Sequence, residues 1–150
     1  MGRLLADHLR KRADFLRAQK GVRRSAAGLT LEICATPEPA AKAGRIRVGF
    51  TASRKVGGAV ERNRAKRRLR AAAQAILTEQ GIERTDYVLV ARTATLTRPY
   101  DELLKDLAQI LAAAHVKLES LAKAEMAKLA ALAQEGAGDG DDAKRSDVRG

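Results

Sequence analysis

The densest concentration of chemically capable side chains lies between Arg54 and Arg70. These seventeen positions hold eight basic residues and a single acid, Glu61. Arginine presents a planar fork of donors that matches phosphate oxygens, and lysine adds a compact positive charge. Hydrolysis by a protein alone would need a general base in a suitable setting or a cage of metal ligands, and one glutamate among cations supplies neither. The segment therefore predicts binding of a polyanion, with no catalytic residue in this chain.

Helical spacing sorts the same segment into two faces. On a helix that advances about 100° per residue, five polar side chains fall within roughly 140° of arc: Arg62, Asn63, Lys66, Arg67 and Arg70. Four apolar side chains fall on another arc: Ala65, Leu69, Ala72 and Ile76. Arg64 and Arg68 lie beyond the edges of the polar arc. A helix built only for solubility would more often alternate charges in i, i+4 pairs, so we expect a nucleic-acid-binding face.

The overall charge supports this expectation and limits where the binding surface can be. The chain has 150 residues, a net charge of +11 and 45% hydrophobic residues, but only 3% are aromatic. Residues 1–70 carry 19 basic and 5 acidic side chains, whereas residues 71–150 carry 10 and 13. A solvated surface that only maintains solubility is the alternative, and the clustering in the first half disfavours it. The core must be aliphatic, and surfaces for base stacking must be few.

The sequence gives little support for a membrane span, a secretory signal, a disulfide or a catalytic histidine. No run of about 18 apolar residues predicts a membrane span, and charges interrupt any N-terminal signal core, so we expect a cytoplasmic protein. Cys34 is the only cysteine, which excludes an intramolecular disulfide and favours a small core filler. His8 and His115 are isolated and are more typical of surface or helix residues than of catalysts.

The elements that must position the basic segment can be read from periodicity and turn residues. We expect a helix over 7–20 with Asp7 as its N-cap, and strands over 29–34 and 45–53 that pair as a hairpin-like element. Gly57 and Gly58 open a turn before a long helix over 59–79, and a buried strand follows over 87–91.

The C-terminal third is expected to be helical and then disordered. Apolar spacing after Pro99 predicts one long or two consecutive helices over 100–134. The part from 117 is a solvated helical extension or, as an alternative, a partner-binding coiled coil. Residues 135–150 carry acids, bases and four glycines with a single apolar valine, which predicts a disordered tail.

The basic segment closely resembles the signature of the bacterial ribonuclease P protein component. That family places a Lys-x-Gly-x-Ala-Val-x-Arg-Asn-x-x-Lys-Arg-x-x-Arg pattern after a strand. This chain matches it at Lys55, Gly57, Ala59, Val60, Arg62, Asn63, Lys66, Arg67 and Arg70. Asp14-Phe15 in the first helix and Asp86 to Arg92 before the last one also resemble the family order, and the resemblance covers residues from about 4 to 116.

The resemblance implies a fold and a role. The fold is α+β: a single small α-β-β-β-α-β-α domain, 1–116, with a four-stranded sheet and a left-handed crossover helix (ribosomal protein S5 domain 2-like), followed by the extension over 117–134 and the tail over 135–150. The role is that of the protein subunit of ribonuclease P. Family members bind a catalytic RNA, 1:1 by expectation, and assist the magnesium-dependent endonucleolytic removal of the 5′ leader from precursor tRNA. Magnesium is then expected to enter through the RNA, with none bound by the protein alone.

Roles carry over by position. Contact with the RNA subunit is implied for Ser53, Arg54, Lys55, Arg62, Asn63, Arg64, Lys66, Arg67 and Arg70. Contact with the leader is implied for Phe15, in a cleft between the first helix and the sheet, where a buried core role for Phe15 competes. Gln19 stands where many relatives have a further aromatic residue, so we expect hydrogen bonding from Gln19 and charge from Arg17 to replace stacking there. Glu32 in that cleft would repel phosphate unless it is paired or turned away. Two other functions stay open, a ribosome-associated RNA-binding module and a self-sufficient nuclease.

Overall fold

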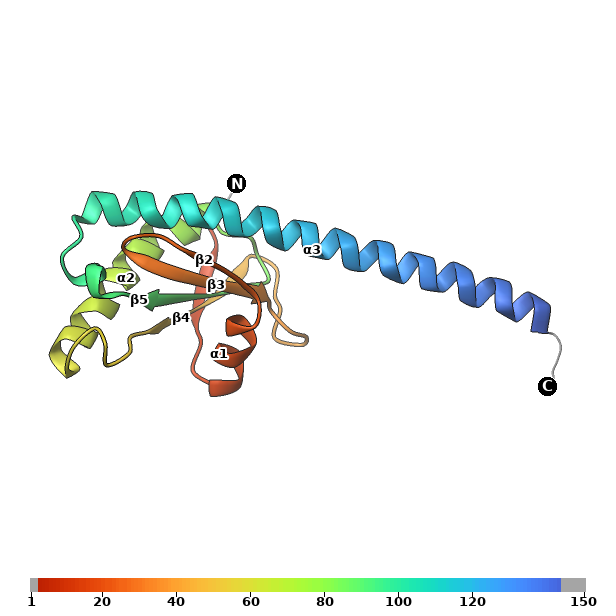
Figure 1. Ribbon diagram of the computed structural model, residues 1–150, viewed down its shortest axis with the longest axis horizontal. Coiled ribbons are helices and arrows are strands. Elements are labelled where there is room, and N and C mark those ends of the chain that lie inside the picture. The colour runs from red at the N-terminus through yellow and green to blue at the C-terminus, as the bar shows by residue number, and fades with distance from the viewer. Residues whose placement is uncertain (1–2, 144–150) are drawn as a thin grey trace. The chain divides into compact units, whose positions relative to one another are not determined.

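A computed structural model describes residues 3–143 of the chain, as strands and helices around one mixed sheet (Figure 1). In chain order the elements are β1 (Leu5–His8), α1 (Arg12–Gln19), β2 (Val22–Ser25), β3 (Leu29–Ala35), β4 (Arg45–Thr51), α2 (Ala59–Gln80), β5 (Thr85–Ala91), a 3-10 turn η1 (Thr93–Leu96) and α3 (Tyr100–Ala143). The chain divides into two compact units, Met1–Val116 and Lys117–Gly150. The fold is α+β, as the sequence predicted.

The sheet has five strands in the order β1-β4-β5-β3-β2, so the expected four-stranded sheet is wrong in its strand number. β1 pairs with β4 in parallel, and β2 pairs with β3 in antiparallel fashion. All four side chains of β1 are exposed. Because no side chain of β1 is buried, the sequence shows no alternating apolar pattern that would predict this strand. Backbone hydrogen bonds to β4 hold β1 at the sheet edge.

The first helix is shorter than the predicted one over 7–20. It begins at Arg12, and Asp7 is a strand residue whose carboxylate accepts a hydrogen bond from Arg45 at 2.9 Å. Asp7 is therefore no N-cap. The apolar spacing that predicted an earlier start combines Leu5, in the exposed strand, with Leu9, which is buried after the strand has ended.

The predicted hairpin between the strands over 29–34 and 45–53 does not form. β5 lies between β3 and β4, antiparallel to the first and parallel to the second. Its residues are buried at every position except one, which confirms the prediction of a buried strand. The connection from β4 to β5 runs through α2 and is the expected crossover helix; its left hand stays a prediction.

The two faces of the sheet meet different helices. Tyr87 of β5 is fully buried and pairs across the sheet with Ile33, and its hydroxyl lies 2.7 Å from Nε2 of His115 on α3. The neighbouring residue Val88 faces the other way and packs in a cluster with Ala18 of α1. One face is thus covered by the longer helices, and the other carries the short helix α1 (Figure 1).

The helix α3 extends through Ala143, beyond the predicted end at 134. The expected disordered tail over 135–150 is therefore wrong for 135–143, where the helix continues, and its remainder lies outside the described residues. Within the second unit the side chains of Leu121, Met126, Leu129 and Leu132 are exposed. Whether this segment is solvated or forms a coiled coil stays a prediction.

Candidate nucleic-acid interface

A glycine turn fixes the start of the basic helix. Gly57 has a φ of 145°, a conformation that disfavours any residue with a side chain. The backbone N–H of Gly58 donates to Oε1 of Glu61 at 3.0 Å. The only acid of the basic segment therefore caps the first turn of α2, where a negative charge also suits the helix dipole. The turn predicted at Gly57 and Gly58 is thus present, and Glu61 has a structural role in it.

The apolar arc of α2 packs into the core. Ala65, Leu69 and Ala72 are fully buried, which confirms the face predicted from spacing. Ile76 is only half-buried, and Leu77 takes the buried position at that end of the helix instead. The long helix is thus held against the sheet by one stripe, and the opposite stripe faces outward.

The polar arc of α2 is available for binding. Among residues 3–143, the side chains of Arg62, Asn63, Lys66 and Arg67 have no hydrogen-bonding or ion-pairing partner. Arg70 lies over the Phe50 ring, with 5.3 Å between its guanidinium carbon and the ring centroid. These cations keep their full capacity to bind phosphate.

The predicted residues of the preceding turn extend this arc. Ser53, Arg54 and Lys55 are all exposed between β4 and α2. The Ser53 hydroxyl accepts a hydrogen bond from the backbone N–H of Lys55 at 3.3 Å, so the turn is locally organised. The structure brings this turn and the polar arc together at the N-terminal end of α2. We call the combined set, Ser53, Arg54, Lys55, Arg62, Asn63, Lys66, Arg67 and Arg70, the cationic face.

Two arginines of α2 are engaged within the protein. Arg68 donates to the backbone carbonyls of Thr95 and Arg98, and Arg64 donates to the carbonyl of Leu96 at 3.3 Å. Both therefore tether α2 to the η1 segment. Arg64, predicted to contact RNA, already has a partner in the chain, although its side chain is exposed. In the sequence, these two arginines differ from the residues of the polar arc in lying beyond its edges, and this was the signal for their different role.

A second surface lies between α1 and the sheet, where the leader cleft was predicted. This cleft has a volume of about 220 Å³ and is lined by Phe15, Gln19, Arg23, Glu32, Thr51, Val88 and Val90. Phe15 is half-buried and packs against the cluster of Leu9, Ala18 and Val88. The two interpretations of Phe15 are thus compatible, since the ring both packs against the core and lines the cleft.

A glycine makes room for that ring. A Cβ at Gly49 would stand 2.5 Å from Cε1 of Phe15, far inside van der Waals contact. The absence of a side chain in β4 at this position lets the aromatic ring rest on the sheet. Gly49 was not singled out from the sequence, because a glycine within a strand gives only a general signal of close backbone approach.

Arg17 is not brought to the cleft with the other two predicted leader residues. Its guanidinium donates to Asp14 at 2.8 Å, whereas Phe15 and Gln19 line the cleft. The cation in the cleft is Arg23, which pairs with Glu32 at 3.0 Å. Burial raises the pKa of Glu32 and the charge of Arg23 opposes that shift. The repulsion expected from Glu32 is therefore reduced by pairing.

A buried charge network supports α1 under this cleft. Arg47 of β4 donates to both oxygens of Asp86, at 2.8 and 2.7 Å, and to Asp14 at 3.2 Å. Asp86 is fully buried and also accepts a hydrogen bond from the Thr36 hydroxyl. Hydrogen bonding from Arg17 lowers the pKa of Asp14, burial opposes this, and Arg47 adds to the lowering. Arg47 thus ties the helix to the sheet.

A further hollow adjoins the cleft, since both are lined by Arg23 and Val90. Its volume is about 410 Å³, and its rim includes Ser53, Lys55 and Arg92. The open face of the sheet therefore leads from α1 to the turn at the start of the cationic face. A single extended polyanion could follow this path.

No metal centre or membrane segment competes with this interpretation in the described part of the chain. Across residues 3–143, no three His, Cys, Asp or Glu side chains are grouped so that they could hold a metal ion. Over the same residues, none of the helices combines the length and the apolar character needed to cross a membrane.

Comparison with known proteins gives a consistent result. The family model described as Ribonuclease P matches residues 6–115. The chain is 49% identical over 108 residues to the ribonuclease P protein component of Ruegeria pomeroyi, covering 71% of this chain and 85% of that protein. It is 47% identical over 102 residues to the same component of Paramagnetospirillum magneticum, covering 67% and 77%. A mutant RNase P protein of Staphylococcus aureus has a similar structure, with a TM-score of 0.59, 27% identity and coverage of 72% and 87%. The family match over most of the chain and the identity to these relatives agree with the sheet, the crossover helix and the cationic face, and the chain belongs to the ribonuclease P protein component family.

Proposed function

We propose that this protein binds the RNA subunit of ribonuclease P through the cationic face. The observation that carries the proposal is the row of cations and Asn63 along α2 whose side chains have no partner among residues 3–143. Arginine and lysine without a partner can bind phosphates without first breaking a contact within the protein, and this binding releases counterions from the RNA. A 1:1 complex of protein and RNA in the cytoplasm is part of this proposal.

The cleft beside α1 is proposed to hold the 5′ leader of precursor tRNA. Phe15 offers an aromatic edge and Gln19 an amide, so the cleft can contact both a base and its polar groups. The cation that lines this cleft is Arg23, paired with Glu32, whereas Arg17 lies outside the lining and is paired with Asp14. The adjoining hollow leads from this cleft to Lys55, so one surface would contact the leader while the other contacts the RNA subunit.

The cleavage itself is assigned to the RNA subunit. Glu61 caps α2, and Asp14 and Asp86 are both paired with Arg47, so these acids are in structural use. Within residues 3–143 no three His, Cys, Asp or Glu side chains are grouped so that they could hold a metal ion, and in this proposal magnesium is held by RNA phosphates. The protein would then contribute binding and orientation of the substrate, which lowers the barrier without any protein group reacting.

A cleavage assay at low magnesium concentration tests this function. Precursor tRNA is incubated with a bacterial ribonuclease P RNA alone, with this protein alone, and with both together. We expect release of the 5′ leader to be faster with both than with RNA alone, and no release with the protein alone. Cleavage by RNase-free protein without RNA would establish a self-sufficient nuclease.

A second measurement addresses the remaining alternative. The protein is used to capture RNA from a bacterial lysate, and the bound RNA is sequenced. Enrichment of ribonuclease P RNA over ribosomal RNA supports the proposal. Selective enrichment of ribosomal RNA, with no stimulation of cleavage in the first assay, would favour a ribosome-associated protein.

A further inference from the structure

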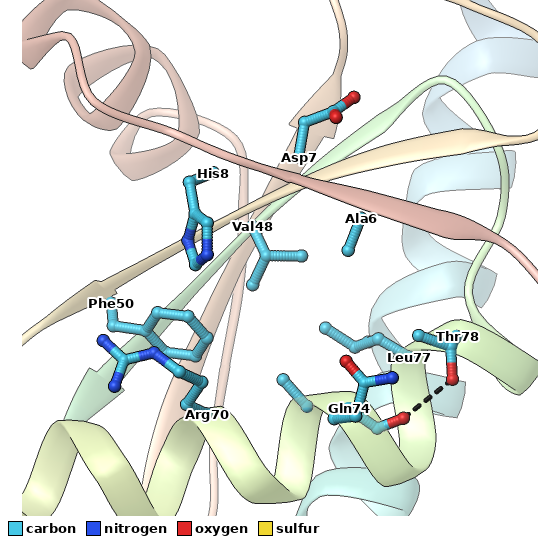
Figure 2. Close-up of a pocket in the computed structure, with 10 residues that line it drawn as sticks. Ala6, Asp7, His8, Val48, Phe50, Arg70, Gln74, Leu77 and Thr78 are labelled. Carbon is cyan, nitrogen blue, oxygen red and sulfur yellow. Dashed lines mark hydrogen bonds between the residues drawn. The ribbon is translucent and has the colours of Figure 1, made fainter.

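A pocket of about 150 Å³ lies between β1, β4 and the second half of α2 (Figure 2). The lining residues that matter here are His8, Val48, Phe50, Arg70, Gln74 and Leu77. A cavity of about this volume is large enough to take one benzene ring. The pocket therefore has room for a single planar ring, and it lies on the opposite side of the sheet from the cleft beside α1.

The lining chemistry suits a nucleobase. Figure 2 shows the His8 ring reaching from β1 toward Phe50, and the Gln74 amide rising from α2 toward β1. Val48 and Leu77 are buried and supply an apolar floor. Aromatic faces stack bases, and an amide can both donate to and accept from a base edge. The pocket thus offers stacking and edge contacts within the space of one ring.

These polar groups are free to bind. Among residues 3–143, the side chains of His8 and Gln74 make no hydrogen bond or ion pair. The one carboxylate at the pocket rim belongs to Asp7, and Arg45 neutralises it at 2.9 Å. Nothing at the rim would therefore repel an approaching phosphate strongly.

Arg70 connects this pocket to the cationic face. Its guanidinium is the last cation of the polar arc on α2, and it lies 5.3 Å from the centroid of the Phe50 ring that lines the pocket. A nucleotide whose phosphate contacts Arg70 would have its base at the mouth of the pocket. Continuity with the phosphate-binding surface favours RNA as the occupant over a free small molecule.

We propose that this pocket binds one unstacked nucleobase of the RNA subunit. The base would stack against Phe50 and His8, with its edge at Gln74 and its phosphate at Arg70. The inference rests on the proposed function, and it adds a base contact to a surface that otherwise binds only phosphates.

Variants of the pocket test the proposal in the full chain. His8→Ala and Gln74→Ala are made singly and together, and Phe50→Leu keeps the apolar bulk while removing the aromatic face. Gln109→Ala, at an exposed position on α3 that lines no described pocket, is the matched control. Thermal melts of all variants establish that each is folded. Affinity for a ribonuclease P RNA transcript is then measured over a range of salt concentrations.

Loss of one stacked base should weaken binding by about fivefold to 150-fold in the double variant and in Phe50→Leu. The slope of log K against log salt should stay at the wild-type value, because no phosphate contact is removed. Wild-type affinity in the folded double variant, together with weaker binding by Arg62→Ala, would overturn the pocket and leave the proposed function standing. Absence of salt-dependent binding by the wild-type protein would instead overturn the proposed function.

A cross-link gives an independent readout. A photoreactive benzophenone side chain is placed at position 74 and, as a control, at position 109. We expect the first to cross-link to one or a few nucleotides of the RNA transcript and the second to none. Equal cross-linking from both positions, or none from position 74, would contradict the proposal.

Discussion

Arg67 and Arg68 are neighbours of the same residue type on α2, and the structure predicts opposite consequences for their loss. Arg67 is exposed and has no partner among residues 3–143, whereas Arg68 donates to two backbone carbonyls, those of Thr95 and Arg98. The pair of substitutions Arg67→Ala and Arg68→Ala therefore separates binding from folding with a minimal chemical difference.

The magnitudes follow from these contacts. A hydrogen bond from a charged group contributes about 1.5 to 3 kcal/mol, and water can replace part of it at a half-buried site. We therefore expect Arg68→Ala to lower the free energy of unfolding by about 2 to 3 kcal/mol, which lowers Tm by about 4 to 12 °C in a chain of this size. Arg67→Ala removes no contact and should leave Tm within about 1 °C of wild type.

Binding to ribonuclease P RNA should instead be changed by Arg67→Ala and kept by Arg68→Ala. If Arg67 contacts one phosphate, its loss lowers the slope of log K against log salt by roughly 0.7 to 0.9. Arg68→Ala, measured well below its Tm, should keep the wild-type slope. Circular dichroism melts and a salt series of binding measurements supply both quantities. A lower Tm for Arg67→Ala with an unchanged slope, or a reduced slope for Arg68→Ala at an unchanged Tm, would refute the assignment.

Three further predictions concern the core, the acid response and the cleft. Leu69→Ala should lower the free energy of unfolding by about 2 to 5 kcal/mol, because the side chain is fully buried; a melt identical to wild type would show that the face is assigned wrongly. The hydrogen bond from Arg17 lowers the pKa of Asp14 in the fold, so its carboxylate stabilises the protein above about pH 4 and this contribution is lost as the pH falls through the lowered value. Asp14→Asn should be less stable at neutral pH and should lose less Tm on acidification than wild type; parallel pH profiles would contradict this. Gly49→Ala should displace the Phe15 ring, since the new Cβ would stand 2.5 Å from it, and should reduce the preference for precursor over mature tRNA while affinity for the RNA subunit is kept; an unchanged preference would remove Phe15 from the leader contact.

The elements with strong periodicity were predictable from the sequence. The long helix was expected over 59–79 and is α2, Ala59–Gln80, because its apolar stripe and its two preceding glycines agree. The strands β3 and β5 also lie where alternation or a short apolar run placed them. Strand β1 carries no such pattern, because its side chains are all exposed and its place at the sheet edge depends on backbone pairing with β4.

Long-range partners were the part that local patterns could not supply. The position of β5 between β3 and β4 depends on pairings between segments far apart in the chain. Arg64 and Arg68 have the same residue type as the binding arginines, and their acceptors are backbone carbonyls about 30 residues away. Arg17 was expected in the cleft from its place on the helix, yet the charge of Asp14 one turn earlier holds it elsewhere.

The central claim is that the cationic face contacts the RNA subunit while the cleft beside α1 contacts the leader. Directed hydroxyl-radical cleavage tests it most directly, with an iron chelate attached to a cysteine introduced as Lys66→Cys or Gln19→Cys. Burial raises the pKa of Cys34 to about 11, so an exposed introduced thiol reacts first. In a complex of protein, ribonuclease P RNA and precursor tRNA, we predict that the chelate at position 66 cuts the RNA subunit and the chelate at position 19 cuts the 5′ leader. Cleavage of the leader from position 66 and of the RNA subunit from position 19, or no localised cleavage from either, would contradict the account.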